Sequence, residues 1–202
     1  MRKSAIGVTS TLLLIGTFLA GAGGAVADEN LNDENVDLQV EVGTRYPGGS
    51  LIMSVDAAAT SLVEVESGDP MIREFTGKLP TVTVTDTRSE VTKPSWYVLG
   101  SAADFVSGED IITSDHMGWT PELAEKYGMF VLPGDEIESV IDDPDSEGLS
   151  DSDGELLYIN AKQEVTMDQI EWSATAQLSL KVAATEVKPG TYKSVMTLSL
   201  FE

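Results

Sequence analysis

The sequence predicts an all-β protein, an antiparallel β-sandwich of the immunoglobulin-like (Greek-key) or jelly-roll type with one short helix. Three observations support this: apolar and polar residues alternate, turn residues separate short runs, and helical periodicity is almost missing. From Ser173 to Val182 every even position is Ala, Leu or Val and every odd position is polar. Period-two alternation buries one face of a strand, and many short strands are typical of a sandwich.

The same alternation covers residues 36–42, the first predicted strand. Further strands are predicted, in chain order, at residues 50–55, 61–66, 72–77, 80–86, 96–100, 136–141, 155–161 and 191–201. Turn residues separate several of these strands, as in Pro47-Gly48-Gly49, Gly68-Asp69-Pro70 and Pro189-Gly190.

One stretch has the signals of a short helix. Thr120 is a suitable N-cap, Pro121 suits the first helical position, and Gly128 suits the exit. These signals predict two turns of helix at most.

The N-terminus predicts export. Arg2 and Lys3 precede an apolar run, and Ala25-Val26-Ala27 then provides small residues for a signal peptidase. We therefore expect residues 1–27 to be a secretory signal peptide and residues 28–202 to be a single β-sandwich domain. The mature protein is expected outside the cell, with no membrane segment.

Charge and cysteine content limit the partners. The mature chain carries ten basic and 34 acidic residues, a formal net charge of −24, which disfavours nucleic acid as a partner through repulsion. The chain has no cysteine, so it has neither disulfides nor thiolate metal ligands, and we expect the core to hold the fold.

Three aromatic residues are predicted to be structural. Burying a tryptophan removes roughly 200 Å² of surface from water, so we expect Trp96 and Trp172 to fill the core. Tyr192 follows the Pro189-Gly190 turn. Its hydroxyl either bonds back to the preceding backbone, as in a tyrosine corner, or the ring is simply the first inward residue of its strand.

Three fragments carry a resemblance to a known family. They are "TVTVTDTRSEVTKPSWYVLGSAADF" from Thr81, "GWTPEL" from Gly118 and "VKPGTYKSVMTLSL" from Val187. They resemble the WxL-type surface domains of Gram-positive bacteria, in which a V-x-D-x-R strand leads to a W-x-L strand and a Gly-Thr-Tyr strand comes late. This chain has Val98 where the family has leucine, and it reads Trp172-Ser173-Ala174 at the second motif.

The resemblance implies an exported β-rich module that attaches non-covalently to peptidoglycan. It therefore implies a non-enzymatic cell-surface protein with a structural or wall-binding role, whose partners are wall polysaccharide or other surface proteins. A polymerising surface subunit is a further alternative, since the last predicted strand runs almost to residue 202 and strand edges pair readily.

The acidic stretch of residues 142–155 is the candidate cofactor site, for calcium. Carboxylates at Asp143, Asp145 and Glu147 followed by Gly148 have the spacing of a calcium loop, and Asp151 and Asp153 add further oxygens. The alternative is a solvated hairpin loop, given its Asp, Ser and Gly content.

A carbohydrate-binding module is the alternative function. Trp119 and Tyr127 flank the predicted helix, and they either stack on a sugar ring, together with Tyr97, or form the apolar underside of the helix. Catalysis has little support, because His116 is the only histidine and its surroundings lack a nucleophile elbow. No catalytic residue is predicted, and a hydrolase that uses paired carboxylates is the least favoured alternative.

Overall fold

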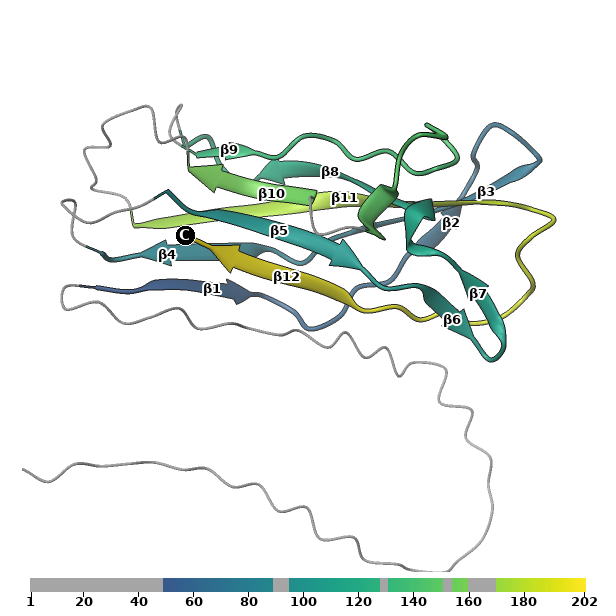
Figure 1. The fold of residues 1–202 in the computed structure, drawn as a ribbon, viewed down its shortest axis with the longest axis horizontal. Helices are drawn as coiled ribbons and strands as arrows, with labels where there is room; N and C mark the ends of the chain where they lie inside the picture. The colour runs from purple at the N-terminus through teal and green to yellow at the C-terminus, as the bar shows by residue number, and fades with distance from the viewer. Residues whose placement is uncertain (1–48, 89–94, 128–130, 151–153, 160–169) are drawn as a thin grey trace, which may run out of the picture. The chain divides into compact units, whose positions relative to one another are not determined.

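The computed structural model describes residues 49–88, 95–127, 131–150, 154–159 and 170–202. These residues belong to one compact unit, which spans Asp33–Glu202. They form an all-β fold of two antiparallel sheets, as the sequence predicts (Figure 1). The predicted strand at residues 36–42, the signal peptide at 1–27 and the domain start at 28 lie outside the described residues.

The first sheet is built around β11 (Glu171–Ala183), the longest strand. On one side β11 pairs with β3 (Ile72–Lys78) and β4 (Val82–Asp86), and on the other it pairs with β8 (Met117–Leu123). Beyond β3 and β4 lie β2 (Val63–Val65) and β1 (Leu51–Val55). The connection between β1 and β2 therefore runs along this edge of the sheet.

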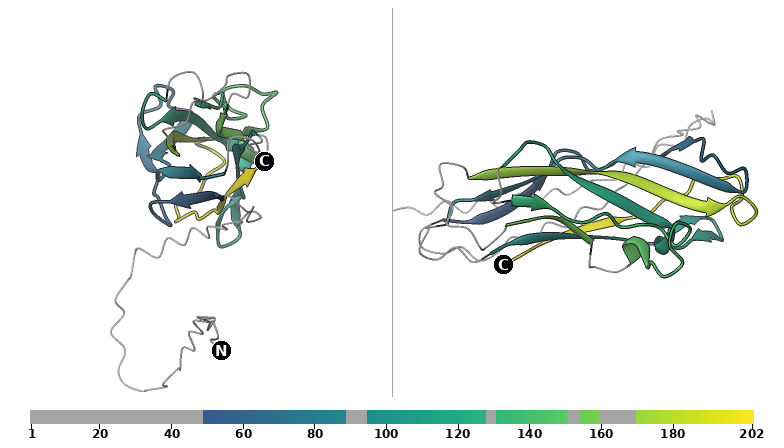
Figure 2. Two further views of the ribbon diagram at one scale, coloured as in Figure 1. Left: turned by 90° about the vertical axis from the view of Figure 1, so that its left-hand side faces the viewer. Right: turned by 90° about the horizontal axis from the view of Figure 1, so that it is seen from above.

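The second sheet has the order β12-β5-β10-β9. Its strands are β12 (Met196–Phe201), β5 (Tyr97–Ala102), β10 (Gly154–Ile159) and β9 (Val131–Pro133). The views in Figure 2 show the second sheet facing the first. A small hairpin of β6 (Phe105–Ser107) and β7 (Asp110–Ile112) and two 3₁₀ turns, η2 (Ser114–His116) and η3 (Gly148–Ser150), complete the described fold.

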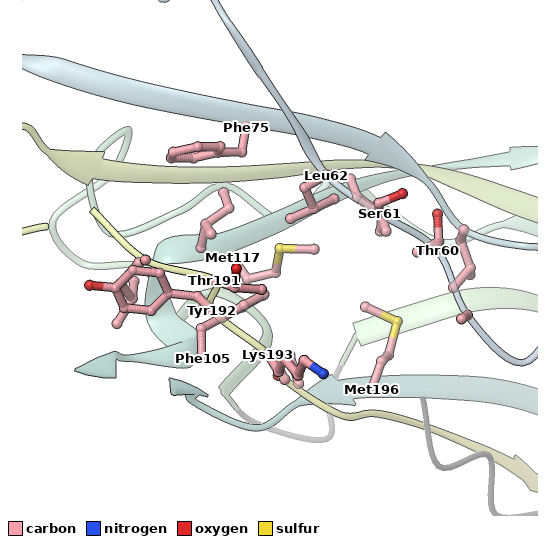
Figure 3. A pocket seen from close by; sticks show the side chains of 18 of the residues that line it. Thr60, Ser61, Leu62, Phe75, Phe105, Met117, Thr191, Tyr192, Lys193 and Met196 are labelled. Atoms are coloured by element: carbon pink, nitrogen blue, oxygen red, sulfur yellow. The ribbon is translucent and has the colours of Figure 1, made fainter. Parts of the chain in front are cut away.

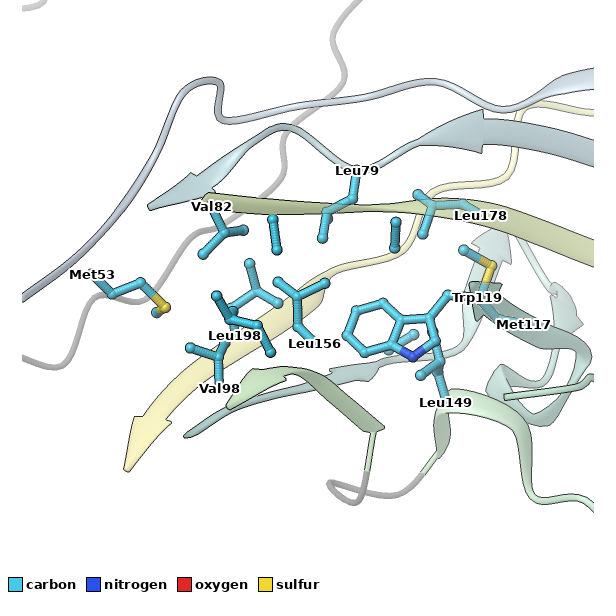
Figure 4. Close-up of a cluster of buried hydrophobic side chains, with 14 of the residues drawn as sticks. Met53, Leu79, Val82, Val98, Met117, Trp119, Leu149, Leu156, Leu178 and Leu198 are labelled. Carbon is cyan, nitrogen blue, oxygen red and sulfur yellow. The ribbon is translucent and has the colours of Figure 1, made fainter. Parts of the chain in front are cut away.

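The core lies between the two sheets (Figure 4). Trp96 and Trp172 are 0 % and 2 % exposed, and their ring centroids are 5.6 Å apart at a tilt of 47°. The prediction that both are core residues is confirmed. A bulge between Glu155 and Leu157 in β10 turns Leu156 and Leu157 inward together, which adds apolar area without lengthening the strand.

The predicted helix beginning at Thr120 is wrong, because these residues belong to β8. Trp119 and Pro121 are buried while Thr120 is exposed, the alternation of a strand. Pairing with β11 over seven residues outweighs the local capping signals. On its other side β8 is joined only by an isolated bridge from Trp119 to Ile137 within the described residues, so Pro121 occupies an edge strand, where proline is tolerated.

Most other predicted strands are confirmed in the residues that the structure describes. The predictions at 50–55, 61–66, 72–77, 80–86, 96–100, 155–161, 173–182 and 191–201 each overlap an observed strand. The prediction at 136–141 is wrong: Ile137 forms a single bridge, and the chain then turns. The Ser139 carbonyl accepts hydrogen bonds from the Asp142 and Asp143 amides, and the Ser139 hydroxyl donates to Asp142, so local turn bonds replace a ladder.

A buried ion-pair network lies beyond the end of β4. Arg88 donates to both carboxylate oxygens of Asp86 at 2.9 Å and to Glu202 Oε2 at 2.7 Å. Asp86 is 0 % and Arg88 4 % exposed. Burial acts to lower the pKa of Arg88, but the bonds and charges of Asp86 and Glu202 outweigh it and raise that pKa. The network joins the first sheet to the last residue of the chain.

Candidate functional site

An apolar pocket lies between the two sheets, beside the β1–β2 connection and the start of β12 (Figure 3). Its volume is about 380 Å³. We call it the edge pocket, and the residues lining it are Val55, Ala57, Ala59, Thr60, Ser61, Leu62, Arg73, Phe75, Leu79, Pro80, Ala102, Phe105, Ile112, Met117, Leu178, Leu180, Val187, Lys188, Pro189, Gly190, Thr191, Tyr192, Lys193, Ser194, Met196 and Leu198.

The pocket exists because two strand edges leave a gap between the sheets. Within the described residues β1 pairs only with β4, and β12 pairs only with β5. Seven residues separate β1 from β2, whereas three separate β3 from β4. This longer connection lines the pocket, with Leu62 packed against the core.

The lining has an unusual charge balance for this protein. The chain holds 34 acidic and 12 basic residues, yet the lining contains three basic residues, Arg73, Lys188 and Lys193, and no acidic one. The ionisable side chains of the lining itself, apart from Tyr192, are therefore basic.

Two of these cations are held by carboxylates that are not part of the lining. Arg73 Nε lies 2.7 Å from Glu64 Oε1, and Lys188 forms an ion pair with Asp110. The bond from Glu64 raises the pKa of Arg73, and the bond from Asp110 raises that of Lys188. Both charges are thus kept beside the pocket, in contacts that are exposed to water and to competing anions.

Tyr192 shapes one wall of the edge pocket. Its hydroxyl donates to the Lys188 carbonyl at 3.2 Å and accepts from the Lys188 amide at 3.3 Å. This bond across the Pro189-Gly190 turn confirms the tyrosine-corner alternative. The corner fixes the segment that carries Lys188 and Lys193 against the small β6–β7 hairpin, where Lys193 exchanges two backbone bonds with Val106.

The aromatic residues predicted to bind ligand do not come together. The assignment of Trp119 to an exposed platform is wrong, because it is 1 % exposed and its ring lies over Gly100 in the core. Tyr127 is half-buried, packs against the core and accepts a bond from the Ser173 amide at 2.9 Å. Tyr97 is half-buried on the outer face of β5 and stacks on Phe201.

A row of aromatic side chains, which the sequence pattern does not predict, crosses the outer face of the second sheet. Tyr97 lies directly opposite Phe201 on one side and Tyr158 on the other. The Tyr97 and Phe201 rings are 5.2 Å apart at 17°. We call these three residues the outer aromatic row. The alternation in each strand gives their faces, but only strand order and register place them side by side.

The acidic loop is described in part. Asp143 Oδ1 accepts the Asp145 amide at 3.0 Å, and Glu147 lies beside the 3₁₀ turn η3. Asp151 and Asp153 lie outside the described residues. Within the described ranges no group of three metal-ligating side chains is found. Calcium binding at this loop stays a prediction.

His116 belongs to a small surface cluster. Its Nδ1 lies 2.9 Å from Asp115 Oδ1 and 3.1 Å from Thr113 Oγ1. A nucleophile–base–acid relay needs the hydroxyl on one imidazole nitrogen and the carboxylate on the other, and here both meet the same nitrogen. Burial acts to raise the pKa of Asp115, but bonds from Thr113 and His116 outweigh it and lower that pKa.

No helix in the described part of the chain is long and apolar enough to cross a membrane. No protein-family model, curated protein or solved structure matches this chain.

Proposed function

We propose that this chain is a secreted, non-enzymatic β-sandwich protein of the bacterial cell surface, with a structural or wall-associating role. Its partners are wall peptidoglycan or other surface proteins. The predicted signal peptide and the resemblance to WxL-type domains motivate the proposal.

The observation that carries this proposal is the position of the residues that resemble the family. Asp86 and Arg88 of the V-x-D-x-R strand form the buried network with Glu202. Trp96 of the W-x-L-like strand packs on Trp172. Tyr192 of the Gly-Thr-Tyr strand forms the corner. These residues of the first and third fragments supply framework, which suits a structural module better than a catalyst.

The single histidine supports the non-enzymatic role. Both the Asp115 carboxylate and the Thr113 hydroxyl meet Nδ1 of His116, so this trio does not align a hydroxyl for proton transfer through the ring. The edge pocket is lined mainly by apolar side chains and has no acidic residue in its lining, which does not suit hydrolysis by paired carboxylates.

A pull-down with purified peptidoglycan tests the wall-associating role. The purified chain is expected to sediment with peptidoglycan at physiological salt and to stay in solution with crystalline cellulose. Two variants are compared with the wild-type chain in the same assay. Arg88→Met breaks the buried network. Ile52→Ala removes an exposed side chain of β1. Absence of the wild-type chain from the pellet at every salt concentration contradicts wall association and leaves only the structural role.

Direct carbohydrate binding is a second candidate, favoured by the outer aromatic row. Aromatic side chains in line on an open sheet face suit stacking on a polysaccharide. Tyr97 and Phe201 stack on each other, however, so the two facing ring surfaces are occupied. If the row binds sugar, the double substitution Tyr97→Ala and Phe201→Ala abolishes retention on insoluble polysaccharide, whereas Ile52→Ala on the other sheet does not.

A further inference from the structure

We propose that residues 36–42 of this chain dock as an added strand on the open edge of β1 and place apolar side chains in the edge pocket. The occupant of the pocket is then a segment of the same chain. The proposal concerns a separate part of the surface and does not depend on wall association. It rests on the apolar walls of the pocket, on the backbone groups at the edge of β1 and on the sequence that precedes β1.

The edge pocket is an apolar hollow that suits filling by aliphatic side chains. Leu62, Phe75, Phe105, Met117 and Met196 lie around it in Figure 3. Protein interiors are close-packed, and voids larger than a water molecule are few. A hollow of about 380 Å³ with mainly apolar walls holds ordered water poorly, so apolar side chains are its natural filling.

The strand β1 presents a second edge to which a further strand can pair. The Asp56 amide donates to the Thr81 carbonyl, so the backbone groups of the even-numbered residues point towards β4. Because these groups alternate along a strand, those of Leu51, Met53 and Val55 point the other way. In the part of the chain that the structure describes, no strand pairs with this second edge. Such an edge is a template for an added strand.

The sequence before β1 has the pattern that this edge requires. Residues 36–42 read VDLQVEV, with an apolar residue at every even position. The connection to β1 is residues 43–50 and contains Pro47-Gly48-Gly49, so the segment can fold back antiparallel along β1. This short connection gives the segment a high effective concentration at its own edge, which favours docking within one chain over docking on a second copy.

The faces of the two strands fix the register. Pairing Val42 with Leu51 sets each even-numbered residue of the segment opposite an odd-numbered residue of β1. Directly opposite residues share a face of the sheet, and Leu51 faces the core, so the apolar residues of the segment face it too. A shift by one residue would turn all of them to solvent. In this register Leu38 lies opposite Val55, which lines the edge pocket.

Cysteine pairs test the docking and its register, and the natural chain has no cysteine to interfere. With Ser54→Cys on the exposed face of β1, Gln39→Cys is directly opposite at a Cα separation of about 4.5 Å, which suits a disulfide. The matched controls Asp37→Cys and Glu41→Cys are diagonal to Ser54→Cys at about 7–8 Å, too far for an unstrained bridge. Under mild oxidation the first pair is expected to close at least about tenfold faster than either control, as a monomer on a non-reducing gel.

A second pair of variants tests the side chain in the pocket. Leu38→Asp places a charge against apolar walls and is expected to release the segment. Binding of a neutral dye for apolar surface, such as Nile red, is then expected to rise several-fold. Gln39→Asp introduces the same charge on the outer face and is expected to leave dye binding unchanged.

Three results overturn the proposal. The first is closure at Asp37→Cys or Glu41→Cys that equals or exceeds closure at Gln39→Cys. The second is cross-linked dimers in place of cross-linked monomers, which assigns the edge to the segment of a second copy. The third is equal dye binding by Leu38→Asp and Gln39→Asp, which means that Leu38 does not fill the pocket.

Discussion

Arg88 Nη1 lies 2.7 Å from Glu202 Oε2, so a side chain just beyond β4 holds the last residue of the chain. Arg88 also binds Asp86, which is wholly buried. A buried carboxylate without its cation is strongly unfavourable, because the protein interior solvates charge poorly. The two sheets are thereby tied where β4 and β12 end.

Arg88→Met tests this network. Removing the cation leaves the Asp86 charge buried, and the expected loss in the free energy of unfolding is about 3–5 kcal/mol. Glu202→Gln is expected to lose about 1 kcal/mol or less, because Glu202 is partly exposed. Urea denaturation followed by tryptophan fluorescence measures both. The control is the double variant Asp86→Asn with Arg88→Met, which is expected to recover part of the loss; equal losses for the single and double variants contradict the charge explanation.

Trp96→Ala tests the tryptophan pair in the core. The expected loss is about 3–5 kcal/mol, since the substitution leaves a large cavity beside Trp172. A double-mutant cycle with Trp172→Ala is expected to give a coupling energy of about 0.5–1.5 kcal/mol for the ring contact. Coupling indistinguishable from zero means that the two rings fill space independently.

Gly100→Ala tests the close packing of Trp119. A Cβ atom at position 100 meets the Trp119 ring carbon Cη2 at 2.4 Å, closer than van der Waals contact allows. The expected loss is about 1–3 kcal/mol, as for other overpacked cores. Adding Trp119→Phe removes the clashing ring and is expected to lower the cost of Gly100→Ala. Thermal unfolding of the four chains measures this, and an unchanged cost places the strain elsewhere.

Acid titration tests the ion pair between Lys181 and Asp142, whose Nζ and Oδ1 atoms are 2.6 Å apart. Burial acts to raise the pKa of Asp142, but bonds from Lys181 and Ser139 outweigh it and hold that pKa below its ordinary 3.8. The hydrogen bond to Asp142 raises the pKa of Lys181 above its ordinary 10.5. The pair therefore stabilises the fold between about pH 4 and pH 10, and its contribution is lost as pH falls through the lowered carboxyl pKa.

Lys181→Met measures that contribution. Because both side chains are partly exposed, the expected loss at pH 7 is about 0.2–1 kcal/mol. The variant is also expected to unfold with a shallower dependence on pH below about pH 4 than the wild-type chain. The control Lys126→Met, at an exposed lysine, is expected to follow the wild type, and a parallel shift of both variants contradicts the assignment.

The local residue pattern predicted most of the strands. It failed where a segment has signals for one kind of structure and tertiary or turn contacts favour another. Residues 173–182 alternate cleanly, and they form the middle of β11. Thr120 and Pro121 have good helix-start chemistry, yet the edge of β11 captures them as a strand. Residues 136–141 have strand-like composition, but the bonds of Ser139 close a turn. Capping and turn signals span three or four residues, whereas a strand edge offers a longer run of partners.

Candidate binding residues were harder to predict than core residues. The sequence predicts Trp96 and Trp172 in the core because burial of a large apolar ring is favourable in almost any sandwich. The same reasoning does not predict which aromatic side chains lie on the outer face of a sheet. Trp119 is buried, whereas Tyr158 belongs to the outer aromatic row. Exposure depends on strand order and register, which a pattern in one strand does not contain.

The sequence by itself determined the strand class, the tryptophan core and the acidic charge of this protein, because alternation, ring size and charge are properties of each segment alone. Only the tertiary structure decided that Arg88 meets Glu202, that Tyr97 faces Phe201, and that Lys188 and Lys193 join Arg73 around an apolar pocket. These groups are far apart in the chain, and the pairing of β5 with β12 and of β3 with β11 brings them together.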